Sequence, residues 1–148
     1  MSNTSEKVNE LQNQVFGNLN QEPVVVTDFV IEEGMYHGWY YRKWNNGRFD
    51  AYITNLYKSA ALSETSISGL YSNTDSGIDV TCPDIGITSF DYISVQDHEM
   101  FSDIVSTKCA WFESGLDGLK HLEIGFYALS SSVNANLSIH ISGTYYKE

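Results

Sequence analysis

The chain is poor in several residue types that would point to a particular protein class. It has 2 Pro and 2 Cys in 148 residues, and 8 Lys and Arg against 19 Asp and Glu, which gives a formal net charge of −11. An acidic chain of this kind repels phosphate backbones and anionic membranes, so we expect no nucleic-acid partner. No apolar run approaches the roughly 20 residues that a membrane span requires, so we expect no membrane insertion.

Sequence signatures of catalysis are scarce as well. The chain contains no Walker pattern, no Gly-x-Ser-x-Gly elbow and no Cys-x-x-Cys pair. Asp97-His98-Glu99 is the one tight group of ligand-type side chains, and we interpret it as a solvated turn because neighbours on a strand point to opposite faces. His37, His121 and His140 are scattered through predicted strands. We therefore predict a protein that is not an enzyme and that needs no cofactor and no metal.

Cys82 and Cys109 are expected to be free, partly buried thiols. The first residues carry no charged-then-apolar leader, which predicts synthesis and folding in a cytoplasm.

Aromatic residues are plentiful, at 14% of the chain with 10 Tyr, and this favours β-structure. From Val24 onward, short segments rich in β-branched and aromatic residues alternate with Gly, Ser, Asn and Asp. About nine short strands at this spacing predict an all-β fold, an antiparallel two-sheet β-sandwich with jelly-roll-like connections. The predicted segments after the first hairpin are 67–71, 78–82, 89–96, 103–112, 120–129 and 134–146.

The residues before Pro23 have a different pattern, which divides the chain into a segment 1–22 and a β-sandwich knob 23–148. Val8, Leu11 and Val15 recur at heptad spacing after a capping Ser5 or Thr4, which predicts a short α-helix. The helix either packs on its own domain or serves for attachment and trimerisation, because an isolated helix of this length is marginal in water.

A hairpin is predicted at residues 36–52, where two aromatic strands flank Asn45-Asn46-Gly47. A three-residue loop places Arg42 opposite Asp50 and leaves Trp39, Tyr41, Phe49, Ala51 and Ile53 on one apolar face. A two-residue loop would instead place Trp44 with Phe49 and Ala51. We favour the three-residue loop because it separates the apolar and polar residues more completely.

The opposite, polar face of this hairpin is the candidate ligand-binding surface. Its aromatic planes, guanidinium groups and carboxylate could contact a sugar, line a trimer interface or form plain framework in which Arg42 bridges Asp50 and Arg48 covers Trp44. The candidate residues are Tyr40, Arg42, Trp44, Arg48, Asp50 and Tyr52.

The segment Tyr41-Arg42-Lys43-Trp44-Asn45-Asn46-Gly47 resembles the Tyr-Arg-Lys-Trp-x-x-Gly hairpin of small β-domains in bacteriophage tail fibre and head fibre proteins. The closing segment 137–146, in which apolar alternation runs into Gly143 and a last aromatic pair, is similar to the terminal strand of those domains. The family often carries an acidic residue and a Cys or Trp soon after the turn. In residues 49–52 of this chain Asp50 matches the acidic residue, and neither a Cys nor a Trp is present.

This resemblance implies a virion component, a homotrimer exposed on the particle that binds polysaccharide on the host cell surface and attaches to another virion protein through residues 1–22. A capsid head fibre or decoration protein is the alternative, and a free-standing carbohydrate-binding module is a third reading.

Overall fold

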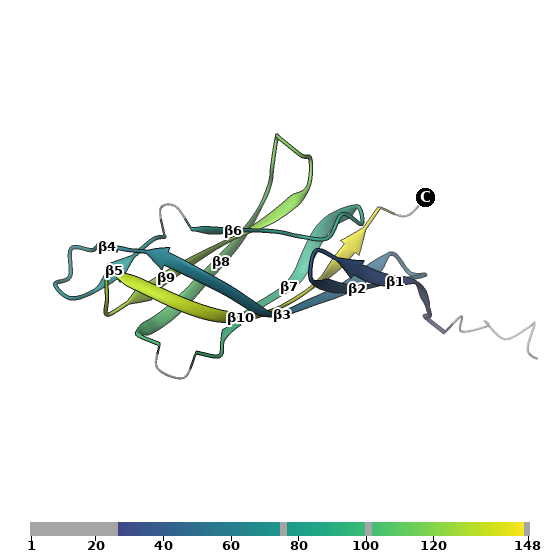
Figure 1. The fold of residues 1–148 in the computed structure, drawn as a ribbon. Helices are drawn as coiled ribbons and strands as arrows, with labels where there is room; N and C mark the ends of the chain where they lie inside the picture. Colours follow the sequence, from purple (N-terminus) through teal and green to yellow (C-terminus); the bar gives the residue numbers. More distant parts are fainter. Residues whose placement is uncertain (1–26, 75–76, 100–101, 147–148) are drawn as a thin grey trace, which may run out of the picture.

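The computed structural model describes residues 27–74, 77–99 and 102–146, and these residues form ten β-strands (Figure 1). The strands pair antiparallel in two sheets, which confirms the predicted all-β, two-sheet architecture. No helix, and so no helix long and apolar enough to cross a membrane, occurs in this described part of the chain. The predicted helix with Val8, Leu11 and Val15 lies outside the described residues.

Sheet A has the strand order β1-β2-β3-β10-β7. Its strands are β1 (Val30–Tyr36), β2 (Trp39–Trp44), β3 (Arg48–Ala61), β10 (Ser132–Tyr145) and β7 (Ile87–Asp97).

Sheet B is organised around β9, which pairs with β8 along one edge and with β5 and β6 along the other, while β4 pairs with β5. Its strands are β4 (Ser63–Glu64), β5 (Tyr71–Ser72), β6 (Ile78–Thr81), β8 (Ile104–Glu113) and β9 (Lys120–Ala128).

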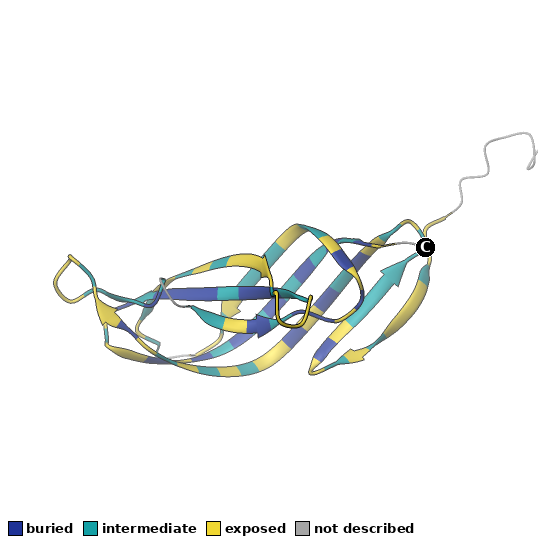
Figure 2. Ribbon diagram, turned by 90° about the horizontal axis from the view of Figure 1, so that it is seen from above, coloured by how far each residue is buried: buried dark blue, intermediate teal, exposed yellow. Residues whose placement is uncertain are grey.

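Alternating side chains from both sheets fill the space between them. Along β10, every second residue from Val133 to Tyr145 is buried, and the residues between them are exposed or half-buried (Figure 2). The facing strand β9 contributes Leu122, Ile124 and Phe126, all fully buried. A period of two in a chain with few charges therefore specifies which face of each sheet is covered.

A bulge in β3 changes the phase of this alternation. Ile53 and Leu56 both pack on the core although they are three residues apart, and the pairing with β10 shifts between Leu137 and Ile139. Asn55 takes up the extra residue with a φ of 53°, a left-handed conformation that Asn adopts more readily than most residues.

One predicted strand is misplaced. Residues 67–71 were expected to form a brief strand, but residues 66–69 form a bend and turn and only Tyr71–Ser72 pair. The reason is Gly69, whose φ of +80° reverses the chain where the apolar alternation of Ile67 and Tyr71 had suggested an extended segment. In the expected strand that starts at Val24, residues 27–29 are not extended strand and the strand begins at Val30, while residues 24–26 lie outside the described residues.

The end of the last strand is joined to the β2–β3 hairpin near the start of the described domain. The Tyr145 hydroxyl donates a 2.6 Å hydrogen bond to the Trp44 carbonyl, and the Tyr145 N–H donates to the Gly47 carbonyl at 3.0 Å. The end of β10 thus holds the turn of the β2–β3 hairpin.

Candidate functional site

The β2–β3 hairpin has the register that the three-residue loop predicts. Arg42 pairs with Asp50 and Tyr40 with Tyr52 across the two strands. Gly47 has a φ of +85°, and its N–H donates to the Trp44 carbonyl at 3.2 Å, which closes the turn.

This register separates the hairpin into the two faces that we expected. Trp39, Phe49, Ala51 and Ile53 are buried, and Tyr41 is partly buried against the same core. All six candidate residues point away from the core, to the outer face of sheet A.

An ion pair crosses the outer face of the hairpin. Arg42 donates from Nε to Asp50 Oδ1 at 3.3 Å and from Nη2 to Asp50 Oδ2 at 3.4 Å, a two-point contact that raises the pKa of the guanidinium. The same guanidinium lies over the Trp44 ring, 5.5 Å from its centroid. The bridge between Arg42 and Asp50 that the framework reading expects is present, but Arg42 rather than Arg48 covers Trp44.

Arg48 forms its ion pair with a different strand. Its guanidinium contacts the carboxylate of Asp91 on β7, two strands away, since β10 lies between β3 and β7. Asp91 was not among the predicted residues, because 43 positions separate it from Arg48 and no local pattern connects the two.

A row of aromatic rings extends the outer face across four strands. Tyr40 lies opposite Tyr52, the Tyr52 ring stacks on His140 with centroids 4.3 Å apart, and Tyr92 meets His140 edge-on at 5.2 Å. The stacking faces of Tyr52 and His140 are therefore turned toward each other. The Tyr40 hydroxyl at one end of the row donates to Glu33 at 2.7 Å.

His140 and Tyr92 belong to this surface although sequence reasoning did not include them. The signal that could have found His140 is the alternation of the last strand, which places it on the face opposite Ile139 and Ile141. Its pairing with Tyr52 required the strand order, which the sequence does not reveal.

Beside the aromatic row, the outer face is hollowed. A cavity of about 320 Å³ is bordered by three of the predicted residues, Trp44, Arg48 and Asp50. Its other lining residues are Asp28, Asn46, Phe49 and Ser142. An aromatic wall, a hydroxyl, an amide and paired charges thus converge on one small open hollow, whereas Tyr40, Arg42 and Tyr52 lie outside it.

The chemistry of this hollow is that of a binding site for a hydroxyl-rich ligand. Arg48 and Asp50 can each donate or accept further hydrogen bonds while keeping Asp91 and Arg42 as partners. Arg48 and Asp50 are each matched by an ion-pair partner, whereas Asp28 in the lining has none among the ion pairs of the described residues, so no unpaired cation is present there to favour an anionic ligand.

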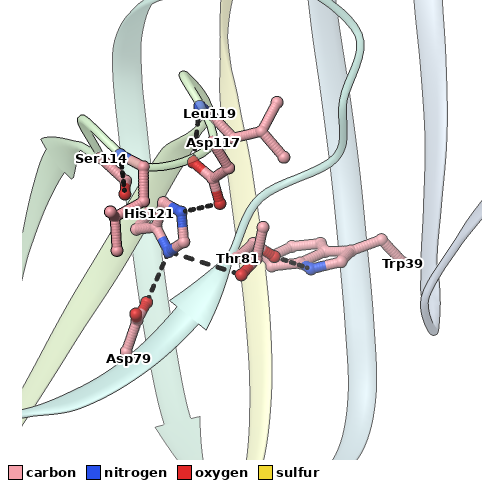
Figure 3. A network of polar contacts seen from close by, with 8 residues as sticks. Trp39, Asp79, Thr81, Ser114, Asp117, Leu119 and His121 are labelled. Atoms are coloured by element: carbon pink, nitrogen blue, oxygen red, sulfur yellow. Dashed lines mark hydrogen bonds and ion pairs between the residues drawn. The ribbon is translucent and has the colours of Figure 1, made fainter.

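A second polar cluster lies on sheet B and surrounds His121, which is buried (Figure 3). Its Nδ1 is 2.7 Å from Asp79 Oδ1, and its Nε2 is 2.8 Å from Asp117 Oδ2. Phe112 stacks on the ring with centroids 5.2 Å apart. Since both ring nitrogens face carboxylates, neither is available to accept a proton from a substrate.

The cluster forms one wall of a groove of about 530 Å³ between β3 and β6. Tyr36, His37, Trp39 and Lys58 border it from sheet A, and Asp79, Thr81 and Asp117 border it from the other side. Sequence reasoning had treated His121 as an isolated strand residue, because residues 79 and 117 show no ligand-like spacing to it.

The remaining candidates have structural roles. His98 contacts the Ser138 hydroxyl at 2.8 Å, and the Asp97 carboxylate accepts from the backbone N–H groups of Glu99 and Asn136. The described residues hold no group of three or more His, Cys, Asp or Glu placed to bind a metal ion. Cys82 and Cys109 are free thiols, and burial raises their pKa values to about 12 and about 11.

Comparisons of the chain with family models, with curated proteins and with solved structures give no match.

Proposed function

We propose that this chain is a non-enzymatic structural protein of a bacteriophage virion, a trimeric knob exposed on the particle that binds glycan on the host cell surface. The virion assignment is supported by the Tyr-Arg-Lys-Trp-x-x-Gly segment, which forms a three-residue-loop hairpin held by the closing strand. The two ends of the domain that resemble the phage family are thus in direct contact.

The observation that carries the binding role is the hollow on the outer face of sheet A. It gathers Trp44, Arg48 and Asp50 with Asn46 and Ser142, so that one aromatic wall and several hydrogen-bonding groups face the same space. Sugars present both apolar ring faces and hydroxyl groups, and this lining can satisfy both.

Charge matching favours a neutral sugar over an anionic one. The two guanidinium groups of the face are paired with Asp50 and Asp91, and the whole chain carries a formal net charge of −11. An anionic polymer would be repelled at long range and would meet only guanidinium groups that already have a partner.

A small, open hollow binds weakly, and trimerisation would compensate for this. Three copies on one knob make the second and third contacts intramolecular, which raises the apparent affinity without any new contact. In this proposal residues 1–22, with Val8, Leu11 and Val15, form the trimer and attach it to another virion protein.

Binding of full-length protein to host cells and to a glycan array tests the proposal. We expect Trp44→Ala and Ser142→Ala to reduce binding at least tenfold, since each removes a wall or a hydrogen-bonding group from the hollow. Tyr57→Ala is the matched control, because Tyr57 lies on the same strand as Arg48 but is exposed at the far end of β3. Unchanged binding in the Trp44 and Ser142 variants would refute the role of the hollow.

The mass of the protein in solution separates the virion knob from the free-standing module. A mass near three times 16.7 kDa supports the knob. A monomer that binds glycans supports the carbohydrate-binding module instead, and a trimer that labels capsids but not cells supports the decoration protein.

A further inference from the structure

The contacts of His121 require its imidazole to be doubly protonated. Nδ1 and Nε2 each lie within 2.8 Å of a carboxylate oxygen, and an ionised carboxylate only accepts hydrogen bonds. Both nitrogens must therefore donate. The ring is then an imidazolium that ties β9 to β6 through Asp79 and to the turn before β9 through Asp117 (Figure 3).

The groups around the ring account for its charge. Burial disfavours the imidazolium and is the largest single influence, but the hydrogen bonds and charges of Asp79 and Asp117 together outweigh it and raise the pKa of His121. From β8 the ring meets the uncharged face of Phe112. The adjoining charges on β9 have other partners: Lys120 pairs with Glu113, and Glu123 accepts the Gly77 N–H.

The two nitrogens differ in what each could do without its proton. Nδ1 has a second neighbour, the Thr81 hydroxyl at 3.4 Å, which can turn its hydrogen toward a neutral nitrogen. Among the described residues, Nε2 has Asp117 alone as a hydrogen-bond partner.

The two carboxylates also differ in how easily each can be released. The Asp79 side chain is 59% exposed, so water can solvate it once it is released. Asp117 is 40% exposed and also accepts the Leu119 N–H at 2.8 Å, which fixes it in the turn and lowers its pKa. Loss of the proton from Nδ1 therefore costs less than loss from Nε2.

We propose that His121 is a pH-operated switch behind the wall of the groove between β3 and β6, which its partners Asp79, Thr81 and Asp117 line: when it loses one proton to solvent, Nδ1 releases Asp79 and accepts a hydrogen bond from the Thr81 hydroxyl. Nε2 keeps its proton and its bond to Asp117. The inference rests on the contacts of sheet B and is independent of the glycan-binding role of sheet A.

The switch changes the charge of the groove. With the imidazolium in place, the two carboxylates and the ring sum to one negative charge, and after proton loss they sum to two. Asp79 and Asp117 both border the groove, and Lys58 and His37 border it from sheet A. The wall formed by sheet B thus becomes more acidic, with a carboxylate free to meet a cationic group.

The change is also transmitted to the core. The Trp39 indole N–H donates to the Thr81 carbonyl at 2.9 Å. Trp39 therefore contacts the same residue whose hydroxyl forms the new hydrogen bond with His121 in the switch. Trp39 is fully buried and belongs to the β2–β3 hairpin of sheet A. The indole N–H resonance of Trp39 is therefore a reporter of the switch.

The experiment is an NMR titration of the ring nitrogens of the full-length protein from about pH 5 to about pH 9, which covers the interval of about pH 5 to 8 in which histidines usually change charge and extends above it for a raised pKa. We expect both His121 nitrogens to be protonated at the acid end and only Nε2 at the alkaline end, with the Trp39 indole N–H shifting at the same midpoint. A neutral ring protonated at Nδ1 would overturn the proposal, and so would an imidazolium that persists until the protein unfolds.

Two variants make the test specific. Thr81→Val removes the hydroxyl that donates a hydrogen bond to the neutral Nδ1. Because only the neutral form of the ring loses a partner, we expect the midpoint of the His121 titration to move to higher pH. Asp79→Asn removes a partner of the charged form, and we expect it to move the midpoint to lower pH. Midpoints that move in the opposite directions would refute the exchange.

Discussion

The register of the β2–β3 hairpin predicts unequal effects for two aromatic residues that lie near each other in the chain. Phe49 is 1% exposed and meets Phe90 edge-on at 6.3 Å between centroids, whereas Trp44 is half-buried on the outer face beneath Arg42. We therefore expect Phe49→Ala to reduce the free energy of unfolding far more than Trp44→Ala.

The magnitudes follow from what each substitution removes. Truncating a buried Phe to Ala costs about 3 to 5 kcal/mol, in part through the cavity that it leaves. Trp44→Ala loses a cation–π contact of about 0.5 to 1 kcal/mol and part of its apolar contact area, so we expect a loss of about 1 to 2 kcal/mol. For a domain of this size each kcal/mol lowers Tm by about 2 to 4 °C, which gives a fall of about 12 °C for Phe49→Ala and about 4 °C for Trp44→Ala.

Urea unfolding followed by far-ultraviolet circular dichroism measures both losses without relying on tryptophan fluorescence. The slope of the free energy against urea should be the same in the two variants and the parent chain, because the same surface is exposed on unfolding. Equal losses for Phe49→Ala and Trp44→Ala would refute the assignment of faces, and a loss of 4 kcal/mol for Trp44 would place it in a core or a tight subunit interface.

Three further predictions concern titration, thiol chemistry and close packing. The folded-state pKa of His121 is raised above the ordinary 6.5, so its contribution to stability is complete below pH 6.5 and is lost as the pH rises through the raised value. Urea midpoints that fall over this pH window in the parent chain but not in His121→Gln would verify this contribution. The thiols of Cys82 and Cys109 have pKa values of about 12 and about 11. At pH 8 they should react with a thiolate-specific reagent at least a hundredfold more slowly than in urea-unfolded protein. A rate equal to that of the unfolded chain would contradict their burial. Gly143→Ala should destabilise the domain by several kcal/mol, since its Cβ would collide with the Ser89 backbone carbonyl of the neighbouring strand, and a variant that melts within 2 °C of the parent would show that β7 can move away.

The sandwich was predictable because the information for it is local. Alternation of apolar and polar residues along segments such as 134–146 identifies both the strand and its buried face, and turn residues mark where strands end. The failure at residues 67–71 has a local cause of the same kind, since Gly69 adopts a left-handed φ that overrides the alternation.

The candidate surface was predictable only in part. The six residues of the hairpin share one outer face because the three-residue turn fixes the register of two adjacent strands. The hollow also needs Ser142, and the ion pair of Arg48 needs Asp91; both come from strands that lie far away in the chain.

The amino-acid sequence by itself predicted the fold class and narrowed the hairpin to two registers, of which it favoured the one that the structure has, with its division of residues between core and surface. These depend on the period of two and on turn chemistry, which act between residues a few positions apart. The tertiary structure alone decided that His121 lies between Asp79 and Asp117, and that Tyr52 stacks on His140. Such contacts depend on strand order, which is set by the packing of two whole sheets and leaves no spacing in the sequence to read.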